Sequence, residues 1–587
     1  MTDDRLLLLL VLIASPLAAQ QRARPPLSAG DIGDITQLVM MEDRRAFDRA
    51  ELGRLLASPQ AEVRRRAVLT LGRLADPRGR ELARAAAHDP DTAVAATALF
   101  AVGQLKDSGA VPWIDSVLAS RATPVTVARE AAGALGKIKT ADARRSLAHF
   151  LETAPNGIRM APVIGEALLS IGRMPVRGDI APIVRWATSP DIEVRWRASW
   201  ALFRPRDPVA VPHLMRLARD PSPLVRAWAV RGLSAARVDS SGTPLARATA
   251  LLRAAVHDPD RSVRTEAVRA LGTYQDSASF DVLVNGLTAT DSWISVSAAE
   301  GLGRMTNRTA DATRVLVAAA APGKPRALRI TAMQSLLALS PPDAIPVAES
   351  LSHDTTATSH LAVLGAARRL GSSNGRGIAE RFADDGDIEV REEARRVLDA
   401  LAGRVDSSAA QASPMVRPIE TGRSEADYRR MVERWVVPSY EGKAPPVTRW
   451  VTSRGIVDIE LYPGDAPIAV DDLVRSVEAG AVDGVEFERV VPNFVDQQRA
   501  IRQTGILRDE VNRRRLTRGN LSWATGGLDT GIPAYTFGIT PQPHNEGDFT
   551  SLGRVIRGME GVDRMQLGDR VLKVTMLPAS RSPRSIK

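Results

Sequence analysis

A group of apolar residues that recurs about every thirty positions constrains the fold of this chain more than any other feature. In each copy an apolar anchor is followed by a small residue, usually alanine, after four positions and by an aliphatic residue after four more. This spacing places all three on one helical face. The anchors are Val63, Val94, Val127, Val163, Val194, Val225, Val263, Ile294, Leu328, Ala362 and Val390. Successive anchors lie 28 to 38 residues apart, so residues 45–403 are predicted to form a solenoid of stacked helical repeats.

The residues around each copy indicate where its helices begin and end. Asp-Pro pairs at Asp89, Asp220 and Asp258 suit an N-cap followed by proline in the first helical turn. Glycines such as Gly103 and Gly136 follow the third apolar position, where they are expected to end the inner helix.

The array resembles HEAT repeats of the short bacterial type, because Val-Arg pairs recur at the anchors. These pairs are Val63-Arg64, Val194-Arg195, Val225-Arg226, Val263-Arg264 and Val390-Arg391. Each arginine is expected to reach an acidic residue or a helix end in the next repeat; the alternative is contact with a partner. HEAT solenoids bind through a concave face, so protein partners are expected there.

Three tryptophans occupy consecutive repeats and allow two interpretations. Trp196, Trp200 and Trp228 are predicted to be large core residues. If they were exposed instead, they would form an aromatic patch suited to binding a peptide.

Composition narrows the possible functions. The chain has 587 residues, no cysteine and a net charge of +10, and only 7 of its 78 basic residues are lysine. Without cysteine, neither a disulfide framework nor a zinc-thiolate site can form, and the seven scattered histidines show no ligand spacing. The arginines are spread along the helices rather than clustered, so nucleic acid is not an expected partner. No metal or cofactor is expected.

The first residues have the pattern of a secretory signal peptide. Arg5 precedes an apolar run over 6–13, and small residues lead to a cleavage position after Ala19. The run is too short for a comfortable membrane span, and the alternative is a buried N-terminal helix. We therefore expect residues 1–19 to be a signal peptide, and the mature protein to be periplasmic or secreted in a bacterium, with no membrane anchor after cleavage.

After the array and an N-terminal segment at 20–44 are set aside, the rest of the chain divides into three parts. Residues 404–446 have the serine and proline content of a linker, interrupted by a possible helix at 424–436 that begins with a capping box of Ser424 and Asp427. Residues 447–579 show alternating patterns of short strands at 455–461, 485–490, 520–524, 535–539, 552–556 and 571–576. Helices are predicted at 467–479 and 558–565, and residues 580–587 form a tail.

The C-terminal part resembles the cyclophilin-type peptidyl-prolyl isomerases. The order of motifs carries the resemblance: Ile459–Pro463, Ala466-Pro467, Asp483-Gly484, Phe487–Gln497, Gly519–Ser522, Pro541–His544 and Gly553–Val555. This family implies a mainly-β closed antiparallel barrel with two capping helices. The predicted architecture is thus an all-α HEAT solenoid followed by a cyclophilin-like barrel.

The resemblance also implies roles for particular residues. It makes Arg489 the catalytic arginine, Phe494 a wall of the proline pocket and Gln497 the residue that holds the substrate backbone. Val495 and Leu552 are expected as further pocket walls. The other positions of the family's groove are occupied here by Thr525, Ala534, Thr536 and His544.

Several of these positions depart from the family pattern. Glu488 replaces the usual histidine before the arginine, and Gln498-Arg499-Ala500 replaces Gly-Gly-Asp. Thr525 stands in place of a backbone-binding asparagine. Ala534 and Thr536 replace a glutamine and a second pocket phenylalanine.

Two functions follow from this pattern. The first is an exported peptidyl-prolyl cis-trans isomerase that assists protein folding, with proline-containing polypeptides as substrates and the HEAT array as a protein-binding scaffold. The alternative is a catalytically inactive cyclophilin-like peptide-binding module in a scaffold protein. A nucleic-acid-binding HEAT protein is a distant third.

Overall fold

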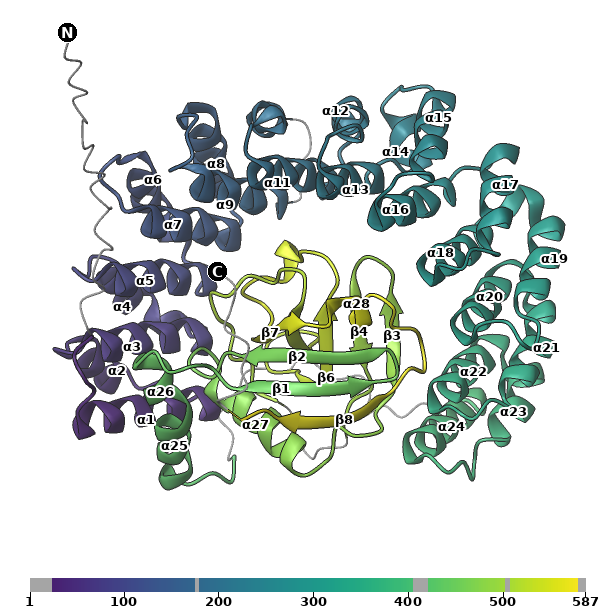
Figure 1. Ribbon diagram of the computed structural model, residues 1–587. Helices are drawn as coiled ribbons and strands as arrows, with labels where there is room; N and C mark the ends of the chain where they lie inside the picture. Colours follow the sequence, from purple (N-terminus) through teal and green to yellow (C-terminus); the bar gives the residue numbers. More distant parts are fainter. Residues whose placement is uncertain (1–23, 175–178, 405–420, 502–506, 579–587) are drawn as a thin grey trace, which may run out of the picture.

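A computed structural model shows an arc of paired helices that curves around a β-barrel (Figure 1). The structure describes residues 24–174, 179–404, 421–501 and 507–578. The predicted signal peptide and the tail therefore lie outside the described residues.

The arc contains an inner and an outer row of helices. The inner row is α1 (Ala29–Arg44), α3 (Ala61–Leu74), α5 (Thr92–Gln104), α7 (Val125–Ile138), α9 (Ala161–Gly172), α11 (Ile192–Phe203), α13 (Pro223–Arg231), α16 (Arg261–Leu271), α18 (Ser292–Leu302), α20 (Arg326–Leu339), α22 (Ala357–Leu370) and α24 (Ile388–Leu401). The outer row is α2 (Arg49–Leu56), α4 (Arg80–Ala86), α6 (Val111–Ala119), α8 (Ala141–Thr153), α10 (Ala181–Val184), α12 (Val211–Leu217), α14 (Ala235–Ser240), α15 (Leu245–Ala255), α17 (Ser277–Gly286), α19 (Thr309–Ala319), α21 (Pro341–Leu351) and α23 (Ser372–Glu380).

The repeated anchors lie on the inner helices, as predicted. The repeat pattern predicted that the array begins at residue 45. The structure adds one earlier helix, α1, which packs on α3 and buries Ile35 and Leu38. Trp196, Trp200 and Trp228 are core residues.

Three of the five Val-Arg arginines join neighbouring repeats by hydrogen bonds, which confirms the predicted structural role for these three. The Arg64 guanidinium donates to the Asp89 carboxylate at 2.7 Å and to the Ser58 carbonyl at 2.9 Å. Arg195 makes the same bridge to Asp220, and Arg226 to Asp258. Asp89, Asp220 and Asp258 are therefore acceptors of these bridges rather than N-caps, which corrects the prediction. The N-cap positions lie two residues later, at Asp91, Ser222 and Asp260.

The recurring glycines have two roles. Gly272 and Gly303 are the C-cap residues of α16 and α18, as predicted, whereas Gly103 and Gly136 allow inner helices to approach closely. Gly103 and Gly136 lie inside α5 and α7, and neither has a positive φ. A Cβ atom at Gly103 would lie only 2.9 Å from the Cα of Ala134 on the next inner helix. The prediction that these two glycines are helix stops is wrong.

The C-terminal domain is an eight-stranded antiparallel sheet that curls into a barrel. Its strands are β1 (Val447–Thr452), β2 (Gly455–Leu461), β3 (Phe487–Val491), β4 (Val495–Gln498), β5 (Asn520–Ala524), β6 (Ile532–Gly538), β7 (Ser551–Arg557) and β8 (Val571–Met576). They are ordered β3-β4-β6-β5-β7-β2-β1-β8. Backbone hydrogen bonds between 484–487 and 568–571 bring the two edge strands together without a full ladder.

Aromatic packing fills the barrel, and two helices accompany it. The ring of Trp450 meets Phe537 edge-on at 5.5 Å and Tyr535 at 6.0 Å. Helix α27 (Pro467–Glu478) packs its apolar face on the sheet, and α28 (Met559–Val562) is shorter than the predicted helix. The predicted combination of a helical array and a cyclophilin-like barrel is confirmed.

A short helical connection leads from the solenoid into the barrel. It consists of α25 (Glu425–Met431), a π-helical turn at Val432–Val436 and α26 (Val437–Tyr440). The predicted capping box is present, because Ser424 accepts from the Asp427 amide and the Asp427 carboxylate accepts from the Ser424 amide. Helix α25 packs against α1 and α27, so it joins the two domains.

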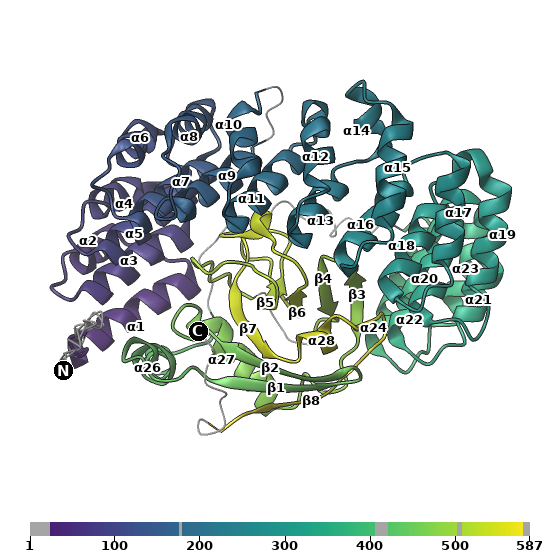
Figure 2. The same cartoon turned by 45° about the horizontal axis from the view of Figure 1, so that its top comes forward.

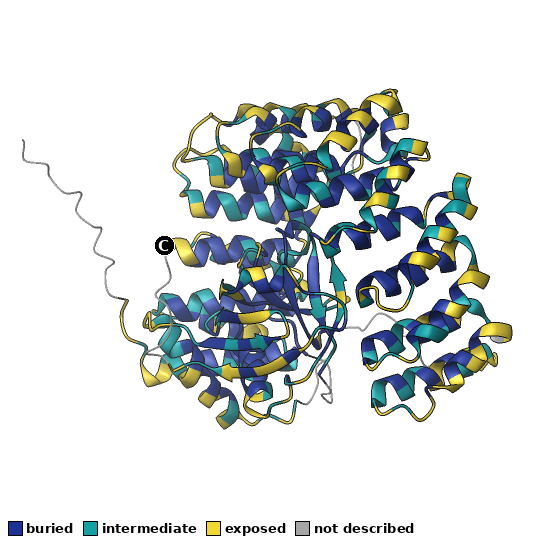
Figure 3. Cartoon of the chain, turned by 45° about the vertical axis from the view of Figure 1, so that its right-hand side comes forward, coloured by how far each residue is buried: buried dark blue, intermediate teal, exposed yellow. Residues whose placement is uncertain are grey.

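The barrel occupies the concave side of the solenoid. Figures 1 and 2 show the arc passing around the barrel from α1 to α24, and Figure 3 shows buried residues continuing from the inner helices into the barrel. The concave face, where we expected protein partners, is thus covered to a large extent by the chain's own barrel. One apolar core joins α1–α16 to the barrel, whereas most core residues of α17–α24 form a separate core.

Polar contacts fix the barrel at several points along the arc. They link Gln104 to Gly547, Lys137 to Asp548, Arg173 to Pro543, Glu166 to Arg515, Arg261 to Asp563, Arg269 to Pro492, Thr358 to Glu486 and Asp387 to Arg499.

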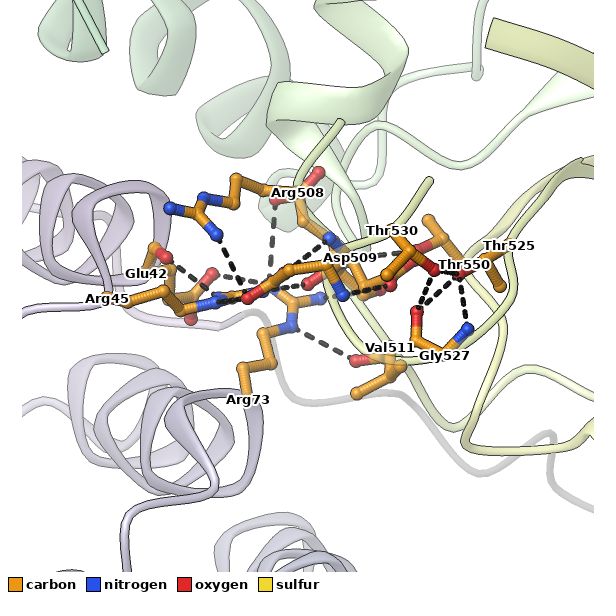
Figure 4. A network of polar contacts seen from close by, with 12 residues as sticks. Glu42, Arg45, Arg73, Arg508, Asp509, Val511, Thr525, Gly527, Thr530 and Thr550 are labelled. Atoms are coloured by element: carbon orange, nitrogen blue, oxygen red, sulfur yellow. Dashed lines mark hydrogen bonds and ion pairs between the residues drawn. The ribbon is translucent and has the colours of Figure 1, made fainter. Parts of the chain in front are cut away.

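The most deeply buried of these contacts lie at the N-terminal end of the arc (Figure 4). Arg45, which follows α1, forms a buried ion pair with Asp529 and donates to the Asp509 carbonyl at 2.8 Å. Arg73 of α3 donates to the Val511 carbonyl at 3.0 Å. Arginine suits this role because its fork donates to several acceptors at once.

Within the described residues, the apolar helices all fall short of the length and hydropathy that a membrane crossing needs.

Candidate active site

The hairpin of β3 and β4 carries the residues that sequence reasoning placed at the centre of the site. Arg489 of β3 pairs directly with Gln497 of β4 in the antiparallel register. The turn between the strands is closed by the Phe494 amide, which donates to the Val491 carbonyl at 3.0 Å. Asn493 takes the left-handed conformation that this tight turn requires, with φ at 53°. Arg489 and Phe494 thus lie on either side of one short turn.

Arg489 is available to a ligand. Its side chain is exposed, and within the described residues its guanidinium makes no hydrogen bond or ion pair with another residue. The guanidinium carbon lies 5.7 Å from the centre of the Phe494 ring. A donor in this position can reach a group that rests on that ring.

Phe494 and His544 form the wall beside the arginine. Their rings stack nearly parallel, with centroids 5.9 Å apart and an interplanar angle of 19°. Burial, and to a lesser extent the positive charges of Arg204, Arg231 and Arg173, lower the pKa of His544 to about 4. The imidazole is therefore neutral near pH 7, which keeps this wall uncharged.

Gln497 is partly engaged by a residue that the family pattern does not predict. Its amide donates to the Glu488 carboxylate at 3.2 Å. Burial raises the pKa of Glu488, and the nearby Glu389 carboxylate raises it further. A substrate backbone that binds Gln497 has to share or replace this hydrogen bond.

The other predicted groove residues divide into two groups. Thr536 of β6 pairs with Gln497 of β4, and its hydroxyl lies 2.7 Å from that of Ser522. Val495 is buried in the β3–β4 hairpin. Ala534 and Leu552 are fully buried in the barrel. Thr525 bonds within its own turn to the Gly527 carbonyl and the Thr530 hydroxyl (Figure 4). The structure therefore gathers Arg489, Phe494, Gln497, Val495, Thr536 and His544 on or beside one hairpin, and holds Thr525, Ala534 and Leu552 elsewhere.

Histidine, aspartate and glutamate side chains do not gather into a metal-binding group of three or more anywhere in the described part of the chain.

Comparison with known proteins identifies the domain that carries this hairpin. The family model for cyclophilin type peptidyl-prolyl cis-trans isomerases matches residues 448–579. Peptidyl-prolyl cis-trans isomerase B of Bacillus subtilis is 34% identical over 126 residues, which cover 20% of this chain and 88% of that protein. A peptidyl-prolyl cis-trans isomerase of Synechococcus elongatus is 30% identical over 134 residues, covering 22% of this chain and 92% of that protein. The chain belongs to the cyclophilin family.

A second family model and a solved structure also match parts of the chain. The model for HEAT repeats matches residues 49–126, 80–165, 161–234 and 248–337. A solved cyclophilin-type isomerase from Cryptosporidium parvum aligns with 23% of this chain and 98% of its own, at 18% identity and a TM-score of 0.22.

The HEAT solenoid holds the turn of the cyclophilin site directly. Arg269 of α16 donates to the Pro492 carbonyl at 2.9 Å, and the side-chain amide of Asn493 donates to the Glu266 carboxylate at 2.9 Å. Glu266 and Asn493 are both buried. The turn that separates Arg489 from Phe494 is thus fixed by a helix of the other domain.

A cleft of about 200 Å³ lies between β3 of the cyclophilin domain and helices α18 and α20. Arg489 and Glu488 line one side, and Trp293, Val296 and Glu300 line the other. Sequence reasoning missed these solenoid residues as well as Glu266 and Arg269. Their place on inner helices was predictable, but nothing in the repeat pattern indicates that a cyclophilin domain packs against them.

Proposed function

We propose that the protein is an exported peptidyl-prolyl cis-trans isomerase that acts on proline-containing polypeptides at a groove centred on Arg489. The observation that carries this proposal is the exposed guanidinium of Arg489, which has no hydrogen-bond or ion-pair partner among the described residues and lies beside the Phe494–His544 stack. Family membership supports the reaction type.

The geometry suits catalysis of rotation about an X-Pro bond. The barrier arises from amide resonance and is about 18–20 kcal/mol. A proline ring placed on Phe494 lies within reach of Arg489, whose donor can bond the prolyl nitrogen as that atom loses resonance. A donor held in advance against the changing atom stabilises the transition state more than the ground state. The reaction needs no cofactor.

The HEAT solenoid would serve as a scaffold in this function. Its contacts to the turn through Glu266 and Arg269 support a role in holding the site, and its outer helices offer surface for protein partners. Export is supported by the apolar run and small-residue stretch at 6–19. Fractionation of cells that express the full chain tests export: a cytoplasmic protein of uncleaved mass would contradict it.

A direct test of the function uses the full chain, the Arg489→Ala variant and the Arg489→Lys variant in an isomerisation assay with a prolyl peptide. Loss of one aligned donor is expected to lower kcat/KM by about 10²–10³-fold. Lysine restores the charge without the planar fork and should recover only part of the activity. Equal rates for wild type and Arg489→Ala would overturn the proposal.

A second candidate function is peptide binding without turnover. The hydrogen bond between Gln497 and Glu488 favours this alternative, because it occupies the Gln497 amide, which the isomerase function would need to hold the substrate backbone. A wild-type protein that binds prolyl peptides but leaves their isomerisation at the uncatalysed rate would support this alternative.

A further inference from the structure

The cleft between β3 and the solenoid gives the proposed prolyl site a second wall. Arg489 shares this cleft of about 200 Å³ with α18 and α20. Small-molecule sites are usually about 300–1,000 Å³, so the cleft is narrow. A folded surface cannot enter a space bounded closely by two elements, whereas an extended polypeptide segment can.

The lining of the cleft combines apolar and acidic character. Val490 and Val491 of the barrel and Trp293 and Val296 of α18 supply apolar surface. Besides Arg489, the charged groups that line the cleft are the carboxylates of Glu300 and Glu488.

Glu300 is poorly neutralised by its own domain. About one-third of its side chain is exposed, and its ion partner, Arg269, lies 3.9 Å away, at the limit of an ion pair. The same Arg269 is already engaged, because it donates to the Pro492 carbonyl at 2.9 Å. The Glu300 carboxylate can therefore form an ion pair with a cationic group of a ligand.

Glu488 forms no ion pair with any of the described residues. Its carboxylate accepts a hydrogen bond from the uncharged side-chain amide of Gln497. The nearby arginine, Arg499, is held instead by the carboxylates of Asp387 and Glu389. Two carboxylates thus face the cleft beside the arginine that we assign to catalysis.

We propose that this cleft extends the prolyl site and selects extended segments in which a lysine or arginine lies near the proline, with Glu300 as the residue that sets the preference. The proposal rests on the function proposed above. Consecutive residues of an extended chain are spaced about 3.8 Å apart, so a residue close to a proline bound on Phe494 lies at the cleft. Its long cationic side chain reaches Glu300 while its methylenes lie on Val296.

The test compares two peptides that differ only in having lysine or glutamate two residues from the proline. Wild-type full chain should isomerise the lysine peptide about two- to five-fold faster in kcat/KM, which is the size of a partly exposed ion pair. The preference should disappear in Glu300→Gln. The preference for lysine should be unchanged in Glu349→Gln, a matched substitution on the outer helix α21 of the solenoid.

A binding measurement with the same peptides separates this inference from the proposed function. If neither peptide is turned over, the proposed isomerase function fails, and the ratio of the two dissociation constants still decides the inference. A lysine preference in affinity that Glu300→Gln removes supports it. Equal behaviour of both peptides with wild type, or a lysine preference that persists in Glu300→Gln, overturns it.

Discussion

At the scale of single residues, the site combines a retained arginine with altered neighbours. Arg489 is exposed beside Phe494, and Glu488, which takes the place of the family's histidine, binds Gln497. A carboxylate at this position changes the groove in two ways. It engages the Gln497 amide, and it adds negative charge next to Arg489.

The first prediction concerns the bond between Glu488 and Gln497. Glu488→Ala frees the Gln497 amide, so we expect KM for an uncharged prolyl peptide to fall by about two- to ten-fold, since a typical hydrogen bond contributes about 0.5–1.5 kcal/mol. Glu488→Gln keeps an acceptor and serves as the control, with KM close to that of wild type. Steady-state kinetics measure both, and a KM in Glu488→Ala equal to or above the wild-type value would contradict this role.

At the scale of elements, helix α16 and the turn after β3 act as one unit. Asn493 is held in its left-handed conformation by a buried hydrogen bond to Glu266, and Arg269 binds the adjacent carbonyl. These solenoid residues touch neither Arg489 nor Phe494 by a hydrogen bond. They fix the turn that sets the distance between the two, so they are positioning residues.

The second prediction follows from this contact. Glu266→Ala leaves the buried Asn493 amide without its acceptor, and we expect kcat to fall by roughly ten-fold as the turn loosens, with a smaller change in KM. Glu266→Gln retains an acceptor oxygen and should recover most of the activity. Kinetics of both variants, with Arg314→Ala on the outer helix α19 as control, provide the measurement. Full activity in Glu266→Ala would show that α16 does not position the site.

The elements themselves were predictable to different degrees. The inner helices follow from the spacing of anchors such as Val225, because helical periodicity is a local property. Strand β4 was missed because Val495–Gln498 reads as polar, although Asp496 and Gln498 are buried. Contacts such as Asn493 with Glu266 join residues 227 positions apart, and no local pattern encodes them.

At the scale of the whole molecule, the cyclophilin domain is enclosed by the solenoid that precedes it. The N-terminal part of the arc shares a core with the barrel and adds buried arginine contacts through Arg45 and Arg73. The C-terminal part has largely its own core and reaches the barrel through polar contacts such as Arg499 with Asp387. The first end therefore anchors the barrel more firmly than the second.

The third prediction concerns the pH dependence of this anchor. Burial raises the pKa of Glu510 to about 8, against the attraction of Arg73, whose guanidinium lies 3.7 Å away. Between pH 4.5 and 8 the unfolded chain releases this proton while the folded protein keeps it. The free energy of unfolding must then fall as pH rises through that window.

Thermal unfolding of wild type and Glu510→Gln checks the prediction. The glutamine side chain is neutral at every pH, so the variant avoids the loss of stability that wild type shows as pH rises. The melting temperature of the variant minus that of wild type should therefore increase by several degrees between pH 5 and pH 8. A difference in melting temperature that stays constant between pH 5 and pH 8 would show that Glu510 is not the titrating group.

The most direct test of the central claim is exchange NMR spectroscopy of an X-Pro peptide at equilibrium with a small amount of the full-length protein. Uncatalysed cis-trans exchange takes tens to hundreds of seconds. We predict that wild type makes this exchange much faster, and that Arg489→Ala loses most of the acceleration. An exchange rate with wild type equal to that of the peptide alone would contradict the claim that this solenoid-enclosed cyclophilin domain is an isomerase.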